Sequence, residues 1–198
     1  MKKHLSMGIF ALGIIGMFAC NDANNDGTTT SGTDTSVSVD TDTSNSNMQE
    51  SVPLDSGSVM FVTKAASGGM MEVQLGQIAQ EQAQNQRVKD FGAMMVRDHG
   101  KANDELKSIA SSKNVTLSDS LMPMHMRHVA DMRKKKGVSF DKAYMSMMVD
   151  DHQKDIQDYE KASNSLSDGE IKAFATRTLP TLKAHLDSAN SINKSKKQ

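Results

Sequence analysis

The chain has 198 residues, enough for one domain of ordinary size, and 37% of them are hydrophobic. Residues 58–198 carry only four more positive than negative charges, which excludes a strongly basic nucleic-acid-binding domain, and we expect no nucleic acid partner. The single Cys excludes a disulfide framework and a Cys-based zinc finger.

Residues 1–19 have the pattern of an export signal. Lys2 and Lys3 precede a mostly apolar run, Leu5–Ala19, that is too short to cross a bilayer comfortably. The sequence Met-Phe-Ala-Cys at positions 17–20 resembles the lipobox of bacterial lipoproteins. This resemblance implies that Cys20 is lipidated, becomes the mature N-terminus and anchors the protein to a membrane. We expect a bacterial envelope protein, in the outer membrane; an ordinary cleaved signal or an uncleaved anchor is the alternative.

Residues 20–57 are rich in Asn, Asp, Thr, Ser and Gly, with seven acidic residues and no Lys or Arg. Such a segment cannot bury enough apolar surface to offset its ordering entropy. It is therefore predicted to be a disordered acidic linker, followed by a folded domain over residues 58–198.

Four long stretches of helical periodicity follow, at 58–84, 86–113, 139–165 and 169–194. The turns around Asn85 and Asp168-Gly169 are short, so consecutive helices should be antiparallel. Ser139 is predicted to cap the third helix, and Ser167 or Asp168 the fourth. Residues 114–138 form a long crossover with a short helix near 124–136. The sequence predicts an all-α antiparallel four-helix bundle.

Each helix has one strongly polar residue near the middle of its inward-facing side: Glu72, His99, His152 and His185. Residues 72 and 99 are equidistant from the first turn, and residues 152 and 185 from the second. Partners equidistant from a tight turn lie level in an antiparallel pair. We therefore predict one polar layer inside the bundle.

Two interpretations of this layer remain open. Three imidazoles and a carboxylate suit one transition-metal ion, such as Zn, Fe, Mn, Cu or Ni. A hydrogen-bonded layer without metal, which fixes the helix register, is the alternative. Asp98, Asp151 and Asp155 are candidate acceptors for the imidazole N–H groups, although Asp151 and Asp155 could equally be solvated.

Four segments resemble a ferritin-like family of bacterial envelope proteins of unknown function, often labelled predicted outer membrane protein. They are Phe61–Ala79, Val88–Leu106, Phe140–His152 and Ile171–Leu186. The most specific pieces are the Glu72 segment, Asp98-His99, His152 and Leu-Pro-x-Leu-x-x-His at 179–185. The resemblance implies a ferritin-like four-helix bundle, usually exported, and no known reaction. Ser118 departs from the family, which often has Pro near this position.

A di-iron enzyme is disfavoured, because the residues three before His99, His152 and His185 are Val96, Val149 and Leu182. Di-iron bundles use Glu-x-x-His motifs. An enzyme is possible, but no catalytic motif in the sequence supports one. The two functions left open are a metal-binding envelope protein and a non-catalytic structural or interaction module.

A second candidate site, which we call the minority copper site, lies in the crossover, where thioether and imidazole groups that suit copper are close in sequence. Its residues are Met122, Met124, His125, Met126 and His128. The alternative is that these methionines pack the crossover against the bundle. At Gly68-Gly69, one turn before Glu72, we expect a close helix crossing, and room for a bound group is the alternative.

Overall fold

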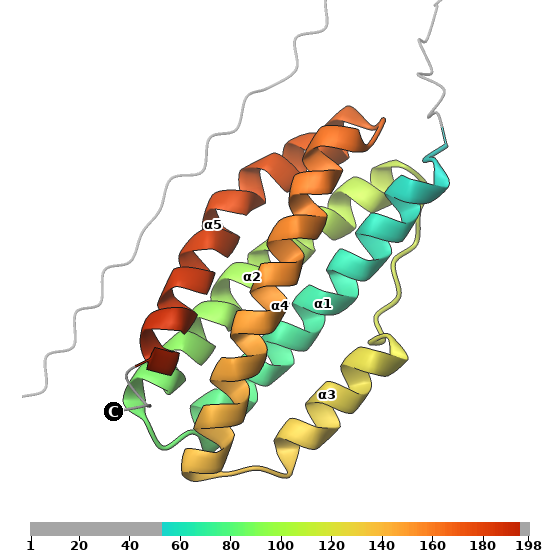
Figure 1. The fold of residues 1–198 in the computed structure, drawn as a ribbon. Helices are drawn as coiled ribbons and strands as arrows, with labels where there is room; N and C mark the ends of the chain where they lie inside the picture. Colours follow the sequence, from blue (N-terminus) through green and yellow to red (C-terminus); the bar gives the residue numbers. More distant parts are fainter. Residues whose placement is uncertain (1–52, 195–198) are drawn as a thin grey trace, which may run out of the picture. The chain divides into compact units, whose positions relative to one another are not determined.

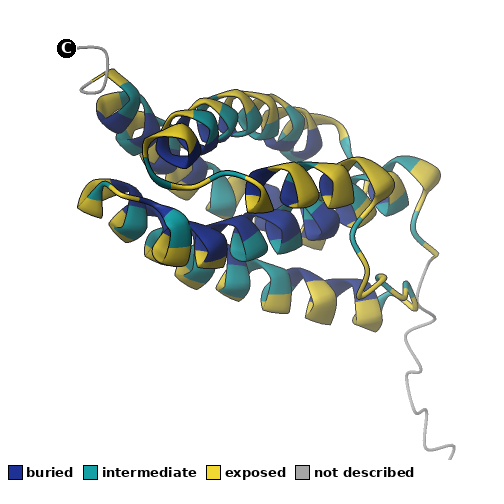
Figure 2. Ribbon diagram, turned by 90° about the horizontal axis from the view of Figure 1, so that it is seen from below, coloured by how far each residue is buried: buried dark blue, intermediate teal, exposed yellow. Residues whose placement is uncertain are grey.

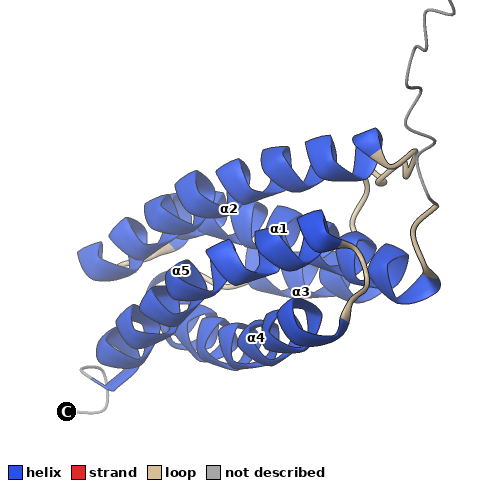
Figure 3. Ribbon diagram, turned by 90° about the horizontal axis from the view of Figure 1, so that it is seen from above, coloured by secondary structure: helices blue, strands red, loops and turns tan. Residues whose placement is uncertain are grey.

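The computed structural model describes residues 53–194, and all secondary structure in this part of the chain is helical (Figure 3). The predicted signal peptide, the lipidation site Cys20 and nearly all of the predicted linker lie outside the described residues. Within residues 53–194, none of the helices combines the length and apolar character needed to cross a bilayer.

The helices are α1 (Ser56–Gln82), α2 (Gln86–Ser112), α3 (Pro123–Arg133), α4 (Gly137–Ser165) and α5 (Gly169–Lys194). The four long ones lie side by side, and α3 lies along the outside of the bundle (Figure 1). The strongest packing is within the hairpins α1–α2 and α4–α5, while α3 packs on α1 and α4. This confirms the predicted ferritin-like antiparallel four-helix bundle with a crossover helix.

Three of the helix starts are fixed by Asp or Asn side chains. Asp55 caps α1 by accepting a hydrogen bond from the Ser58 amide, so residues 56 and 57 are helical and do not belong to a linker. Asn85 caps α2. Asp168 Oδ1 accepts from the amides of residues 170 and 171 at the start of α5, as predicted.

The predicted capping role of Ser139 is wrong. The helix α4 begins two residues earlier, at Gly137, whose φ of +57° is a left-handed conformation that favours glycine. Ser139 Oγ instead donates to the Lys136 carbonyl. Nearby, the buried Asp141 carboxylate accepts hydrogen bonds from the backbone N–H groups of Gln84 and Asn85. These bonds tie the second hairpin to the turn of the first.

Two glycines set the distance between α1 and α2. A Cβ placed on Gly92 would lie 2.7 Å from the Gly76 carbonyl oxygen and 2.8 Å from Ala79 Cβ. One on Gly76 would lie 2.5 Å from the Gly92 oxygen. At the predicted crossing, Gly69 is tightly packed on Asn103 and Gly68 is not. The backbones of this hairpin therefore touch one turn beyond Glu72.

Buried residues line the inward faces of the helices (Figure 2). The 4-3-4-3 spacing of a bundle helix predicts Phe61, Ala65 and Gly68 on the inward face of the first half of α1. This prediction is wrong by one residue, because Val62, Ala66 and Gly69 are buried instead. The described core consists of two apolar clusters: one includes Leu75, Phe91 and Met148, and the other Leu106, Phe174 and Leu182.

The crossover helix α3 is attached through its histidine and aliphatic residues. His125, Val129 and Met132 are its buried residues. Ser67 Oγ on α1 lies 2.7 Å from His125 Nδ1 and accepts a hydrogen bond from the Met122 amide. Met122, Met124 and Met126 are 40%, 45% and 49% exposed, so they do not belong to the buried core.

Candidate metal centre

The structure brings the four predicted polar residues together in the core. Glu72 is 1% exposed, His99 7%, His152 0% and His185 2%. They come from α1, α2, α4 and α5 in turn, since each stands on the inward face of its helix and at the expected height. The single polar layer therefore exists as a structural feature.

The three imidazoles form a compact group. Their ring centroids are 5.3–5.6 Å apart. Each ring can offer one nitrogen such that the three atoms all lie within 4.8 Å of one another. Three buried histidines within reach of one another can hold a metal ion.

Each imidazole also has one nitrogen directed at an oxygen acceptor. His99 Nδ1 lies 2.9 Å from Glu72 Oε2, and His185 Nε2 lies 3.0 Å from Asp98 Oδ2. His152 Nδ1 lies 2.9 Å from the Met148 carbonyl, one turn earlier on α4. These oxygens fix the ring protons on those three nitrogens, which is how metal-binding histidines are oriented in proteins.

The second nitrogen of each neutral ring then carries a lone pair. His99 Nε2 is buried and has no hydrogen-bond partner among residues 53–194. His152 Nε2 and His185 Nδ1 face each other at 3.3 Å. Two nitrogens bound at about 2.0–2.1 Å to one tetrahedral ion lie about 3.3–3.4 Å apart. The spacing of the pair therefore fits a shared ion.

The electrostatic environment disfavours a proton between His152 Nε2 and His185 Nδ1. Burial lowers the pKa of His99 and of His152 to about 4, although Asp155 and Glu72 respectively oppose this effect. Burial also lowers the pKa of His185. At neutral pH the rings are thus neutral, and two facing lone pairs repel unless a cation lies between them.

Glu72 lies outside the converging set of nitrogens, although the sequence predicted it as a ligand. Its Oε2 contacts the outer nitrogen of His99, and its Oε1 lies 3.5 Å from His152 Nδ1 without a hydrogen bond. Burial raises the pKa of Glu72 to about 7, opposed by His152. The geometry gives Glu72 the place of an acceptor that orients imidazoles.

The three aspartates predicted as acceptors have different positions. Asp98 accepts a hydrogen bond from His185 and is oriented in turn by Arg97. The Arg97 Nε and Nη2 atoms lie 2.7 and 2.9 Å from the Asp98 carboxylate oxygens. This bond with Arg97 is the main cause that lowers the pKa of Asp98. Arg97 was not predicted, and its adjacency to Asp98 was the only signal.

Asp155 and Asp151 make no hydrogen bond to the histidines. Asp155 is half-buried, and burial together with Glu72 raises its pKa to about 8. Burial also raises the pKa of Asp151, and no described residue forms a hydrogen bond with its Oδ2. Neither is a purely solvated surface charge.

The Met148 carbonyl was missed because a backbone acceptor leaves no signal in the side-chain pattern.

The residues of the minority copper site are not gathered in the core. Its three methionines, at the start of α3, are 40–49% exposed. His125 is buried and paired with Ser67, and His128 Nδ1 is buried without a hydrogen-bond partner in the described part of the chain. Among residues 53–194, the group of metal-ligating side chains that converges is the one formed by the three core histidines.

The fold and this layer define a ferritin-like four-helix bundle with a triple-histidine group in its core. The chain belongs to the family described as domain of unknown function DUF4142, whose model matches residues 43–192. This confirms the resemblance found in the sequence.

The structure is also similar to that of a DUF305 fragment from Deinococcus radiodurans. The TM-score is 0.64 at 12% identity, over 73% of this chain and 99% of that chain. At this identity the likeness concerns the fold alone. No curated protein matches the chain.

Proposed function

We propose that this protein binds one divalent transition-metal ion through His99, His152 and His185. The observation that carries the proposal is the convergence of three buried imidazoles, each of which also has one nitrogen beside an oxygen acceptor. Imidazole suits Zn, Cu, Fe and Ni better than Mg or Ca. Zn²⁺ is our reference ion, since its tetrahedral geometry matches the 3.3 Å spacing.

The acceptors have a defined part in this function. Glu72 and Asp98 would hold the ring protons of His99 and His185 outward and offset the charge of the ion. Three protein ligands leave a fourth position for water or another ligand, as in metal sites that exchange or activate a bound molecule. Among residues 53–194, no group near the centre suggests a particular reaction, so the proposal extends to metal binding alone.

We further propose that this metal-binding domain works in the bacterial cell envelope, anchored through lipid on Cys20. This part is supported by the sequence alone, through the apolar run that ends in Met-Phe-Ala-Cys. Radiolabelled palmitate incorporated by the wild type and not by Cys20→Ser would support it, and an unlabelled wild type would contradict it.

The test of metal binding is a calorimetric titration of the purified, chelator-treated protein with Zn²⁺. We expect one ion per chain in the wild type and none in His99→Ala or His185→Ala. His128→Ala is the matched control, because His128 is a half-buried histidine of the same bundle outside the centre. A wild type that binds no ion would leave the polar layer with a structural role only, the second function considered from the sequence.

Variants of the acceptors distinguish them from ligands. Glu72→Gln and Asp98→Asn should still bind one ion, with an affinity about 10–100-fold weaker. Loss of binding in Glu72→Gln as complete as in His99→Ala would instead make Glu72 a fourth ligand, as the sequence predicted.

A further inference from the structure

A cleft between α2 and α5 brings solvent to two of the three histidines. His99 and His185 line it, together with Ala102 and Leu182 on its apolar side. The third histidine, His152 on α4, is fully buried. Of the three histidines, the two that lie nearest to solvent therefore face the α2–α5 side.

An ion pair joins the two helices beside this cleft. Arg177 on α5 lies 2.5 Å from Glu105 on α2, and both line the cleft. Glu105 is six residues beyond His99 and Arg177 eight residues before His185, so the pair lies about 9–12 Å along the bundle from the centre. On the level of the centre, Asp98 and His185 also join these helices, and Arg87 Nη2 on α2 donates to Ser191 Oγ on α5 at 3.0 Å.

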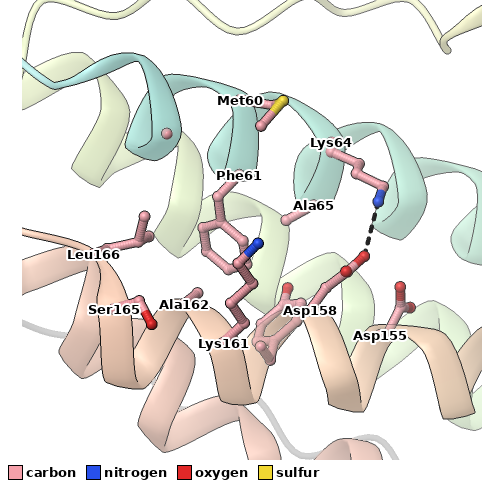
Figure 4. A pocket seen from close by; sticks show the side chains of 12 residues that line it. Met60, Phe61, Lys64, Ala65, Asp155, Asp158, Lys161, Ala162, Ser165 and Leu166 are labelled. Atoms are coloured by element: carbon pink, nitrogen blue, oxygen red, sulfur yellow. Dashed lines mark hydrogen bonds and ion pairs between the residues drawn. The ribbon is translucent and has the colours of Figure 1, made fainter.

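The opposite side of the bundle offers a comparison. A pocket between α1 and α4 has apolar walls that include Phe61 and Tyr159, with Asp155 among its lining residues (Figure 4). None of the three histidines lines it. There Lys64 and Asp158 form the ion pair between the helices, at 2.8 Å.

We propose that the metal ion enters and leaves through the α2–α5 cleft and that the Arg177–Glu105 ion pair limits the rate of this exchange. The inference rests on the proposed metal binding. An ion can reach the inward nitrogens from this side only if α2 and α5 separate locally, because His99 and His185 form the inner wall. The ion pair opposes that separation and touches no ligand, so it should change rates and not affinity.

The experiment measures transfer of Zn²⁺ from the loaded protein to an excess of a chromophoric chelator, and loading of the metal-free protein, by stopped flow. Arg177→Gln and Glu105→Gln should each accelerate release and loading about 1.5–5-fold, the range expected for an exposed ion pair. The Zn²⁺ dissociation constant should be unchanged. The exchanged pair, Arg177→Glu with Glu105→Arg, should restore the slow rates.

Two matched controls break other ion pairs. Lys183→Gln removes the Lys183–Glu160 pair between α5 and α4, at 2.9 Å, whose side chains are 55% and 47% exposed, against 57% and 41% for Arg177 and Glu105. Lys64→Gln removes the pair on the α1–α4 side. Both should leave the exchange rates unchanged.

Acceleration in Lys64→Gln but not in Arg177→Gln would overturn the proposal and place the route on the α1–α4 side. Equal acceleration in all variants would overturn it too, because it would reflect general loosening of the bundle. Failure of metal binding itself is recognised separately, since the wild type would then show no stoichiometric uptake at equilibrium.

Discussion

The contact between Gly76 and Gly92 makes a specific prediction about stability. In Gly92→Ala the new methyl group would meet the Gly76 carbonyl oxygen at 2.7 Å and Ala79 Cβ at 2.8 Å. Backbone and Cβ atoms cannot move away independently, so α1 and α2 must separate. Gly100→Ala on the same helix is the matched control, because its methyl group would meet nothing within 4 Å.

The expected magnitudes follow from two opposing effects. Overpacking costs about 1–3 kcal/mol, while replacing Gly by Ala inside a helix gains up to about 1 kcal/mol. With two contacts below 3 Å, Gly92→Ala should lose about 1–2 kcal/mol of unfolding free energy. Gly100→Ala receives only the gain. The two variants should therefore differ by about 2–3 kcal/mol.

Urea unfolding followed by far-UV circular dichroism measures this difference. The slope with urea should be the same for both variants, so that the midpoints report stability directly. In thermal unfolding, the difference corresponds to about 5–10 °C. Equal midpoints for Gly92→Ala and Gly100→Ala would refute the close backbone approach and, with it, the register that places Glu72 level with His99.

Three further outcomes are expected. Because the pKa of Asp155 is raised to about 8, the folded state keeps a proton that the unfolded chain releases near pH 4, and stability should fall as the pH rises from 4 to 8. In urea unfolding, Asp155→Asn should therefore stabilise the protein by about 1–2 kcal/mol at pH 9 and not at pH 4. The control Asp150→Asn should not stabilise the protein at pH 9. Ser67→Ala removes the partner of His125 and of the Met122 amide, so it should cost about 1–3 kcal/mol and speed hydrogen exchange in α3. Zn²⁺ at a hundredfold excess over its dissociation constant should add about 2.7 kcal/mol to the unfolding free energy, and unchanged thermal melts on adding Zn²⁺ would contradict the metal site.

The sequence predicted the helices and the polar layer where hydrophobic contrast along a helix was strong. In α2, Met95, His99 and Leu106 are buried as the spacing required, between exposed charges. The first half of α1 offered no such contrast, since Ala65-Ala66 and Gly68-Gly69 place small residues on adjacent faces. There the periodicity could not distinguish two neighbouring registers.

The detailed chemistry of the layer was beyond the sequence for a different reason. Whether Glu72 binds an ion or orients His99 depends on which side of one imidazole ring its carboxylate occupies. That is a matter of rotamers within a few ångströms, whereas helical spacing resolves only which face and which turn a residue occupies. The link between Ser67 and His125 was equally inaccessible, because it depends on how the crossover lies on α1.

The position of the layer explains why an ion would suit it. Glu72 and His99 come from the first hairpin, and His152 and His185 from the second. Buried polar atoms without a hydrogen-bond partner in the described core include Glu72 Oε1, His99 Nε2 and the Tyr144 hydroxyl, and each such atom costs about 1–3 kcal/mol. An apolar layer would avoid this cost, so a layer of three neutral imidazoles is favourable mainly when a cation accepts their lone pairs. The same ion would then join the two hairpins at the level where polar side chains interrupt their apolar packing.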